Sequence, residues 1–546
     1  MGKITILFIT TLSFNLAHFS ANAYAQQDIG KLAPLLDGFG KYHYAVSNCS
    51  APAQRFFDQG LELYYSFQFA EAVASFREAA RLDSDCPMVH WGEALSIAPN
   101  VNSRYFRKPE DPKGHGARAV ERAVKLKHKA NEKERGLIEA LRIVYDKKSN
   151  ADSHSRDVAY SRAMGRLYDH YPSDPDVATL YASSLMTLTP WNYWTPDGKP
   201  RPYTEQSEKI FAAVLNSHPD HPGANHFYIH LMENSLHPEK ALESAQRLAE
   251  LVPGSGHIAH MPSHIYAVTG MYYEIIESNV RSLAADKALI AAWGNREFPM
   301  SSVSYTASAT VHGVHAQDFL HMAWVRMGNY KNAMDSARIV AKMSESKISS
   351  NGAAARRYVR PWLTLKRFKK WNEIMKQPLP EDSPPFVQGI WHYGRASALL
   401  AYGKTDEAEE HLAQVRYIAD LPGMDKLYAR VNTGQKLLTI AANVLAGEIA
   451  AKKGQEASAV SYLETAIRLE DSLLYVEPPD WGYPVRQTLG EVLLKFDRPE
   501  EAEMVYWEDL RRNPETGWSL YGVWQSLLRQ GKDLQAREIK KRFVKA

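Results

Sequence analysis

The sequence contains only two cysteines, Cys49 and Cys86, among its 546 residues. So few cysteines exclude a fold held together by a disulfide framework, and their spacing matches no zinc-binding cysteine motif. In an oxidising compartment the two residues can form one disulfide, because we expect both near the starts of successive inner helices. Two free, partly buried thiols are the alternative, and a metal held by the two sulfurs is disfavoured.

The chain also lacks a marked excess of charge of either sign. It has 65 Lys and Arg residues against 62 Asp and Glu residues, a formal net charge of +3, and the basic residues are spread along its length. A nucleic-acid-binding surface concentrates basic residues in a patch or stripe. We therefore expect no nucleic-acid partner.

Long apolar runs are missing as well, apart from the amino terminus. Nothing later in the sequence approaches the roughly 20 apolar residues that a membrane-spanning helix needs, so we predict a mature chain without a transmembrane segment. Residues 1–25 have the pattern of a secretory signal peptide: a lysine, an apolar run over 4–12 and the cleavage sequence AYA ending at Ala25. We predict export to a periplasm or beyond with cleavage near Ala25; the alternative is an uncleaved anchor.

In place of these features the sequence has a repeated helical pattern. Residues 54–84 form a pair of predicted helices, with Phe56 and Gly60 on the first and Ala72 and Phe76 on the second. The small residues let the two helices approach closely, and the aromatic rings fill the space between them. This pattern is typical of a tetratricopeptide unit, a helix pair of about 34 residues.

The pattern recurs along the chain. A turn followed by a second helix with small, large and small residues appears at Gly270, Gly328, Gly403, Gly454, Gly490 and Gly531. We count about ten helix pairs from the period of this repeat class. No stretch alternates with period two for long enough to indicate a sheet. The predicted fold class is all-α: a tetratricopeptide-repeat helical solenoid of stacked antiparallel helix pairs, as a single array or as two packed halves.

The repeats divide the predicted chain into three segments. These are a signal peptide at 1–25, an N-terminal and central array at 26–375 with a histidine-rich inner face, and a C-terminal array at 386–546. Insertions at 98–116 and 191–203 interrupt the first array. Long loops in a compact array are disproportionately functional.

These motifs resemble those of exported tetratricopeptide-repeat proteins of bacteria. The resemblance is carried by FFDQGLELYYSFQFAEAVASFREAARLDSDCPMVHWGEAL near the start, HPGANHFYIHLMENS and GHIAHMPSHIYAVTGMY in the centre, and PPDWGYPVRQTLGEVLL and WEDLRRNPETGWSLYGV near the end. It covers nearly all of the mature chain. It implies stacked helix pairs and a concave surface that binds a protein or peptide partner, but no particular reaction.

Histidines and carboxylates keep a register in three central repeats. Counted from the turn residues Leu236, Gly270 and Gly328, the sets are His226, His230 and Glu233; His257, His260 and His264; and His315, Asp318 and Met322. Steps of three and four residues keep each set on one helical face. By the resemblance, that face lines the concave groove, so we expect these polar residues to converge on one patch.

Two pairs in this patch have the spacing of shared metal ligands. His226 and His230, and again His260 and His264, stand four residues apart on one helix face. Imidazoles and carboxylates without cysteine suit zinc, iron, copper or manganese. We predict that a divalent transition metal is bound by His226, His230, His257, His260, His264 and Glu233. A metal-free polar groove and scattered structural histidines are the alternatives.

Further residues are assigned to ligand binding or to packing. We predict that His315 and Asp318, with Trp191 and Trp194 of the second insertion, contribute to a ligand site beside the metal. The alternative for the tryptophans is an apolar cap on the inner side of the solenoid. Three histidines outside the register are expected to be packing residues, namely His312, His321 and His392.

The sequence therefore predicts an exported tetratricopeptide-repeat scaffold with a metal-binding patch. Its concave groove would bind a peptide, a partner protein or a small ligand. The alternative is a metal-dependent enzyme, a hydrolase or an oxidoreductase, in which Glu233 or Asp318 is a base or ligand. The sequence has no nucleophile elbow, phosphate loop or cofactor fingerprint, so no catalytic residue is assigned.

Overall fold

The computed structural model describes residues 30–105, 108, 110–111, 113–146, 151–195, 197–297, 309–426 and 432–546. The predicted signal peptide lies outside these residues. The described parts of the chain form helices and no sheet strand, with one isolated antiparallel bridge between Trp194 and Pro200. None of the described helices is long and apolar enough to cross a membrane.

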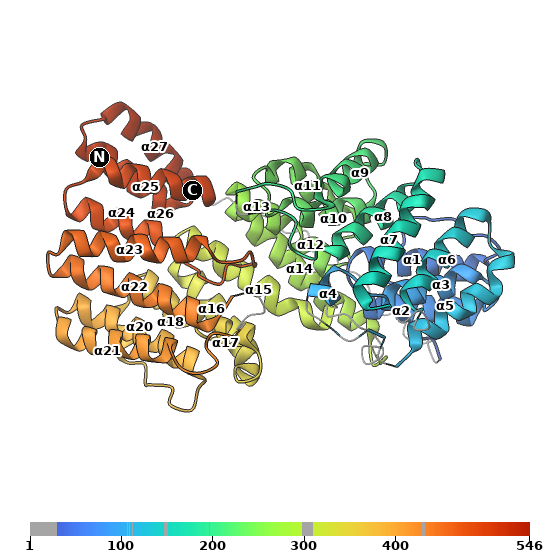
Figure 1. The fold of residues 1–546 in the computed structure, drawn as a ribbon, viewed down its shortest axis with the longest axis horizontal. Helices are drawn as coiled ribbons and strands as arrows, with labels where there is room; N and C mark the ends of the chain where they lie inside the picture. The colour runs from blue at the N-terminus through green and yellow to red at the C-terminus, as the bar shows by residue number, and fades with distance from the viewer. Residues whose placement is uncertain are drawn as a thin grey trace, which may run out of the picture.

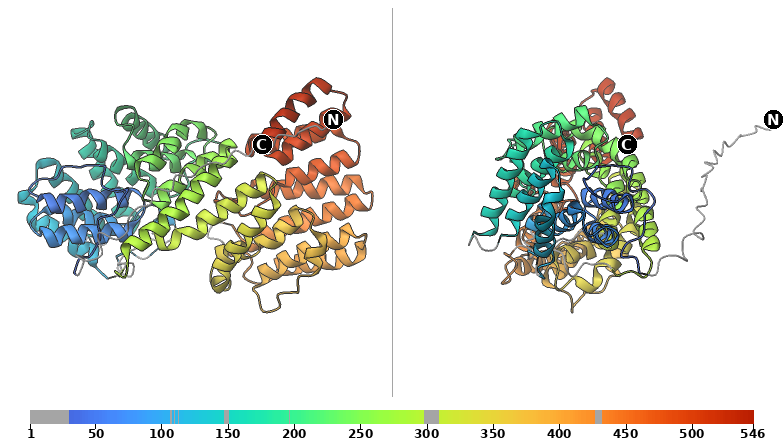
Figure 2. Two further views of the ribbon diagram at one scale, coloured as in Figure 1. Left: turned by 180° about the vertical axis from the view of Figure 1, so that it is seen from behind. Right: turned by 90° about the vertical axis from the view of Figure 1, so that its right-hand side faces the viewer.

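The helices form two halves that lie end to end, with α15 between them (Figures 1 and 2). The first half contains α1 (Ala51–Tyr65), α2 (Phe69–Leu82), α3 (Pro87–Ile97), α4 (Val101–Tyr105), α5 (His115–Leu126), α6 (Glu132–Val144), α7 (Ser153–His170), α8 (Pro175–Leu188), α9 (Thr204–Ser217), α10 (Pro222–Met232), α11 (Leu242–Leu251), α12 (Gly256–His260), α13 (Pro262–Thr269) and α14 (Tyr272–Trp293).

The second half follows α15 (Ala309–Arg326). It contains α16 (Tyr330–Ser344), α17 (Gly352–Tyr358), α18 (Arg360–Arg367), α19 (Trp371–Met375), α20 (Pro385–Ala401), α21 (Thr405–Ala419), α22 (Gly434–Lys452), α23 (Glu456–Asp471), α24 (Val485–Lys495), α25 (Pro499–Arg512), α26 (Gly517–Arg529) and α27 (Asp533–Lys545). Consecutive helices pack as antiparallel pairs, so the predicted all-α tetratricopeptide-repeat solenoid is confirmed.

The first repeat shows why its small residues are needed. The ring of Phe76 on α2 lies between α1 and α3, against Gly60 and Gly92. A Cβ atom would lie 2.9 Å from this ring at Gly60 and 2.2 Å at Gly92, so neither position has room for a side chain. The close approach predicted from the sequence is therefore present in the first repeat.

The turn glycines follow the prediction with one exception. Gly270, Gly328, Gly403, Gly454 and Gly531 have φ between 69° and 82°, the left-handed conformation that glycine adopts readily. Gly490 instead lies inside α24, where a Cβ atom would be 2.4 Å from the Tyr506 ring. Its role as a turn residue was predicted wrongly, because a glycine at a helix contact and a glycine at a turn look alike in sequence.

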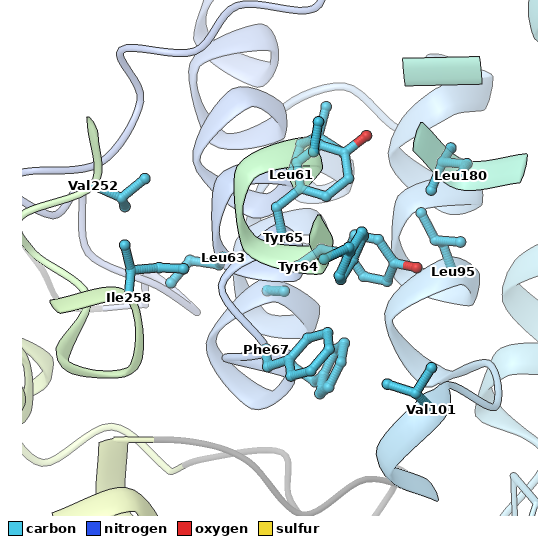
Figure 3. Close-up of a cluster of buried hydrophobic side chains, with 14 of the residues drawn as sticks. Leu61, Leu63, Tyr64, Tyr65, Phe67, Leu95, Val101, Leu180, Val252 and Ile258 are labelled. Carbon is cyan, nitrogen blue, oxygen red and sulfur yellow. The ribbon is translucent and has the colours of Figure 1, made fainter. Parts of the chain in front are cut away.

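Each half has its own apolar core. The first core runs from Ala33 to Ala323, and the second from Ala355 to Ile539. Figure 3 shows part of the first core at the end of α1, where Phe67 lies in the turn before α2. The first core ends and the second begins before residues 376–385, the segment that separates the two predicted arrays. The division into these arrays stays a prediction.

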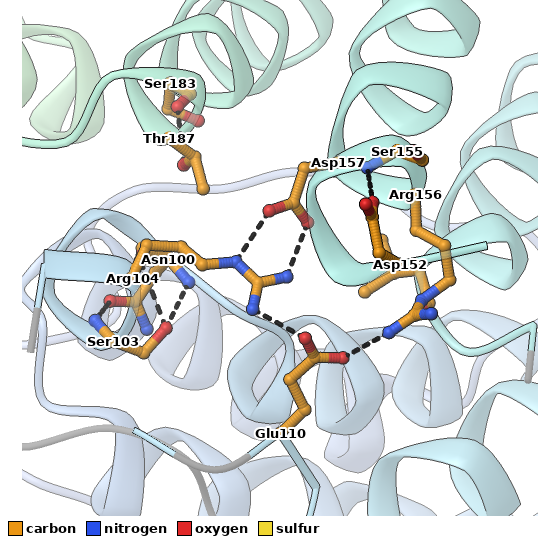
Figure 4. Close-up of polar contacts among 11 residues, drawn as sticks. Asn100, Ser103, Arg104, Glu110, Asp152, Ser155, Arg156, Asp157, Ser183 and Thr187 are labelled. Carbon is orange, nitrogen blue, oxygen red and sulfur yellow. Dashed lines mark hydrogen bonds and ion pairs between the residues drawn. The ribbon is translucent and has the colours of Figure 1, made fainter. Parts of the chain in front are cut away.

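The first insertion is tied down by ion pairs (Figure 4). Arg104 on α4 donates two hydrogen bonds to Asp157 on α7, at 2.6 and 2.8 Å. Glu110 accepts from both Arg104 and Arg156 at 2.7 Å. This insertion is thus bound to α7 by a network of two arginines and two carboxylates.

The two cysteines are free thiols that lie beside each other. Interaction with Cys86 and burial raise the pKa of the Cys49 thiol, while the same contact lowers the pKa of Cys86. Cys86 is the residue before α3, near the helix start expected for it. Their pairing in an oxidising compartment stays a prediction.

Candidate metal centre

Four helices position the histidines of the centre. His226 and His230 lie on α10, His257 and His260 on α12, His264 on α13, and His312 and His315 on α15. We call these seven residues the histidine cluster. The break between α12 and α13 falls at Met261, and Pro262 begins α13, as its rigid ring and missing N–H favour.

The histidine cluster is buried rather than displayed on an open groove. His226 and His260 are fully buried, and the exposed fraction of His230, His257 and His264 is 9% or less. Only His315 is half-buried. The helix face expected to line the groove is covered at these residues, because side chains from distant parts of the chain pack over it.

One set of three histidines brings ligand nitrogens together. One ring nitrogen from each of His226, His230 and His257 lies within 4.8 Å of the other two. The Nδ1 atom of His226 donates to the carbonyl oxygen of Tyr65 at 2.5 Å, and that of His230 donates to Glu233 Oε1 at 3.0 Å. Both rings therefore direct the lone pair of Nε2 into the interior of the set.

A second set has the same construction. One nitrogen from each of His260, His264 and His315 lies within 4.8 Å of the others. His260 Nδ1 donates to Asn279 Oδ1 at 2.7 Å, and His264 Nδ1 donates to Glu233 Oε2. The amide of Asn279 is held in this orientation because its nitrogen donates to Ser263 Oγ at 2.8 Å and to the carbonyl of Ile275 at 2.7 Å.

Glu233 joins the two sets. Each of its carboxylate oxygens accepts the Nδ1–H of one histidine, so it lies behind the rings and fixes their orientation. The hydroxyl of Tyr475 donates to Glu233 Oε2 at 3.2 Å, and Glu477 Oε2 lies 3.4 Å from His264 Nδ1. Tyr475 and Glu477 come from the second half of the chain, and sequence reasoning missed both because nothing local in their sequence points to the histidines.

Burial and the carboxylates of Glu233 and Glu477 shift the pKa values of the histidines in opposite directions. Burial lowers the pKa of His226, His257, His260 and His315 well below the ordinary value, and that of His230 to about 3. Burial acts in the same direction on His264, but attraction by Glu233 and Glu477 raises its pKa to about 10. Most of the cluster is thus neutral imidazole, the form that binds a metal ion.

Two aromatic residues with unusual backbone conformations cover the first set. The centroid of the Phe67 ring lies 4.5 Å from that of His226 and 5.6 Å from those of His230 and His257. The centroids of the Trp191 and His230 rings lie 4.7 Å apart, with the ring planes at 79°. Phe67 has φ of 55° and Trp191 has φ of 60°. Bulky residues rarely adopt these values, and such strain concentrates at functional sites.

The other predicted site residues lie at the edge or away from the cluster. Trp194 donates from Nε1 to the carbonyl of Leu231 at 2.6 Å and so caps the end of α10. Asp318 faces the second half, where its oxygens lie 3.3 Å from Arg357 Nε and 3.1 Å from Arg360 Nε. Asp318 is therefore placed at the joint between the halves and not among the histidines.

His312 was wrongly assigned to packing. Its ring lies 5.2 Å from His257 and 5.0 Å from His260, and its Nδ1 donates to Asp286 Oδ2 at 3.2 Å. The signal was present, since His312 precedes His315 by three residues and shares its helix face. His321 instead contacts Thr364 and His392 contacts His411, outside the cluster.

Comparison with known proteins supports the fold class. The family profile described as tetratricopeptide repeat matches residues 440–472, which span parts of α22 and α23. The match agrees with the tetratricopeptide-repeat fold of the described residues. No curated protein sequence matches it.

Solved structures show only distant likeness. The human IFIT1 dimer with m7Gppp-AAAA is 12% identical, with 89% of this chain and 94% of that chain covered and a TM-score of 0.32. Yeast Tom70 is 12% identical, with 88% and 96% covered and a TM-score of 0.31. Scores this low support no inference from those proteins to this one.

Proposed function

We propose that this chain is an exported tetratricopeptide-repeat scaffold that holds a divalent transition metal in its histidine cluster and binds a protein or peptide partner on its surface. The observation that carries the metal part is the fixed orientation of four imidazoles. In each, Nδ1–H is donated to an oxygen atom of the protein and Nε2 faces other histidines. Metal-binding histidines have this outer-shell arrangement almost without exception.

The partner part rests on the fold class and on an open groove between α7, α8 and α9. The groove has a volume of about 1000 Å³ and is lined by Arg162, Arg166, Tyr181 and Tyr203, among others. A photo-crosslinking residue in place of Tyr203 should form a protein adduct in the cell of origin. The same residue in place of the exposed Leu534 on α27 is the matched control, and equal labelling at both positions would remove the groove from the proposal.

Metal analysis tests the metal part directly. The full chain, purified without a histidine tag or chelator, should contain near-stoichiometric zinc, iron or copper by plasma mass spectrometry. A His230→Asn, His264→Asn double variant should lose it, since Asn keeps a donor near the Nδ1 position and removes Nε2. A His392→Asn, His411→Asn variant is the control, because these two histidines contact each other and are not members of the cluster.

The metal part would be contradicted by metal-free protein that also fails to bind added zinc. The export part would be contradicted by an intact amino terminus on protein recovered from the cytoplasm of the source cell.

A further inference from the structure

The candidate metal ligands of the histidine cluster form two sets of three histidines that share no member, and a third group, His230, Glu233 and His264, takes one histidine from each set. The first set is His226, His230 and His257, and the second is His260, His264 and His315. The helices explain the division: α10 supplies two members of the first set and α12 one, while α12, α13 and α15 supply one each to the second. We infer that the cluster is built for two metal ions, one in each set, an inference that rests on the proposed function.

The nitrogens of the second set face one another at short range. Both Nδ1–H groups of His260 and His264 are donated to oxygen acceptors, so both Nε2 atoms carry lone pairs when the rings are neutral. These two Nε2 atoms lie 2.8 Å apart. A proton supplied by His264 or a metal ion can bridge these two atoms, and a metal ion would also use the nearby ring of His315, 4.7 Å from that of His260.

The first set also brings ring nitrogens together and contains buried nitrogens without a partner. His226 Nε2 carries a lone pair because its Nδ1 donates to a carbonyl, and it lies 3.1 Å from His257 Nε2. His230 Nε2 and His257 Nδ1 are buried and have no hydrogen-bond partner. Buried polar atoms without a partner are costly, so each is a position where a ligand is expected.

The two sets are close enough to form one centre. The rings of His230 and His264, one from each set, lie 5.4 Å apart, and Glu233 accepts a hydrogen bond from both. The charge of two buried cations requires nearby anions. Glu233, Glu477 and Asp286 supply them, because Glu477 approaches His264 and Asp286 accepts from His312 at the edge of the cluster.

The ligand chemistry narrows the choice of metal. Each set offers three imidazoles, and the carboxylate of Glu233 is engaged behind the rings. Imidazole suits zinc, copper and iron, whereas manganese and magnesium prefer carboxylate oxygens. Three protein ligands also leave an open position on each ion, which water or another small ligand can fill.

Zinc binding by the full chain tests this inference. All variants carry His411→Asn, so that the His392–His411 pair cannot add a third ion. Equilibrium dialysis against zinc, followed by plasma mass spectrometry, should give two zinc ions per chain. His226→Asn with His230→Asn should lose one equivalent, and His260→Asn with His315→Asn should lose the other.

The outcomes separate the two claims. One zinc ion per chain, lost in both double variants, would overturn the two-ion inference and leave the proposed metal function standing. Two ions that are both lost in either double variant would overturn the assignment of one ion to each set. No bound zinc in the parent protein would overturn both claims. Far-UV circular dichroism and thermal unfolding without zinc show that each variant is folded. Loading with copper(II) gives a second readout of two neighbouring ions. Two adjacent copper(II) ions should give a weaker electron paramagnetic resonance signal than the measured copper content requires.

Discussion

At the scale of single residues, metal binding by the histidine cluster depends on which ring nitrogen of each imidazole carries the hydrogen atom. A histidine is an acceptor at one nitrogen only if its other nitrogen donates, and here Tyr65, Glu233 and Asn279 supply the acceptors that decide this. Glu233 matters most because it acts on two rings at once. We therefore expect it to influence metal affinity without contacting the metal.

Replacing Glu233 by Gln should weaken zinc binding by about 10- to 100-fold, the usual effect of losing an outer-shell partner. The amide offers one acceptor oxygen in place of two, so one of the two histidines loses its support. Competition with a zinc-binding dye measures the change. Glu239→Gln is the matched control, since Glu239 is exposed and its only histidine contact, His237, lies outside the cluster. Equal affinity in the two variants would contradict the role given to Glu233.

At the scale of helices and repeats, the small residues decide how closely elements pack. The Phe76 ring is held on both sides, by Gly60 of α1 and Gly92 of α3, and cannot move away from an added methyl group. Gly394 in α20 offers the opposite case, because no atom lies within 4 Å of the position that its Cβ would occupy.

Gly92→Ala should therefore destabilise the first repeat by about 1–3 kcal/mol through overpacking. Gly394→Ala should stabilise the protein by about 0.5–1 kcal/mol, because alanine has the better helix propensity. The midpoint of urea unfolding, followed by circular dichroism, measures both changes. A neutral or stabilising Gly92→Ala would show that the first repeat is packed more loosely than the structure indicates.

The register of the histidines could be predicted at this scale, and their burial could not. Spacings of three and four residues place His226 with His230 and His260 with His264 on single helix faces, and the structure brings these faces together. What covers them comes from elsewhere: Phe67 from the first repeat, Trp191 from an insertion and the Tyr475–Glu477 segment from the second half. Such contacts depend on how distant repeats pack, which helical periodicity does not encode.

At the scale of the whole molecule, the two halves meet through polar contacts beside the centre. Asp318 at the end of the first half contacts Arg357 and Arg360 of the second, and Arg360 holds the pKa of Asp318 below its ordinary value against the effect of burial. Tyr272 donates to the carbonyl of Pro514 at 2.8 Å. The segment with Tyr475 and Glu477 makes the second half part of the metal centre itself.

Asp318→Asn should destabilise the joint by about 3 kcal/mol or more, because it leaves two arginine side chains without their buried counter-charge. The folded-state pKa of Asp318 is depressed, so its contribution is present above the ordinary value of 3.8 and is lost as the pH falls below it. Asp335→Asn is the control, since Asp335 pairs with Lys331 at an exposed position. Urea unfolding at pH 7 and pH 4 should show the difference between the variants, and identical midpoints would contradict a joint that depends on Asp318.

The most direct test of metal binding by the histidine cluster is anomalous X-ray diffraction from crystals of the full chain grown with zinc, measured at the zinc absorption edge. We expect anomalous peaks inside the histidine cluster, each about 2.0–2.1 Å from histidine Nε2 atoms, with Glu233 behind the ligands. Crystals that contain zinc but show no anomalous peak within the cluster would contradict this expectation.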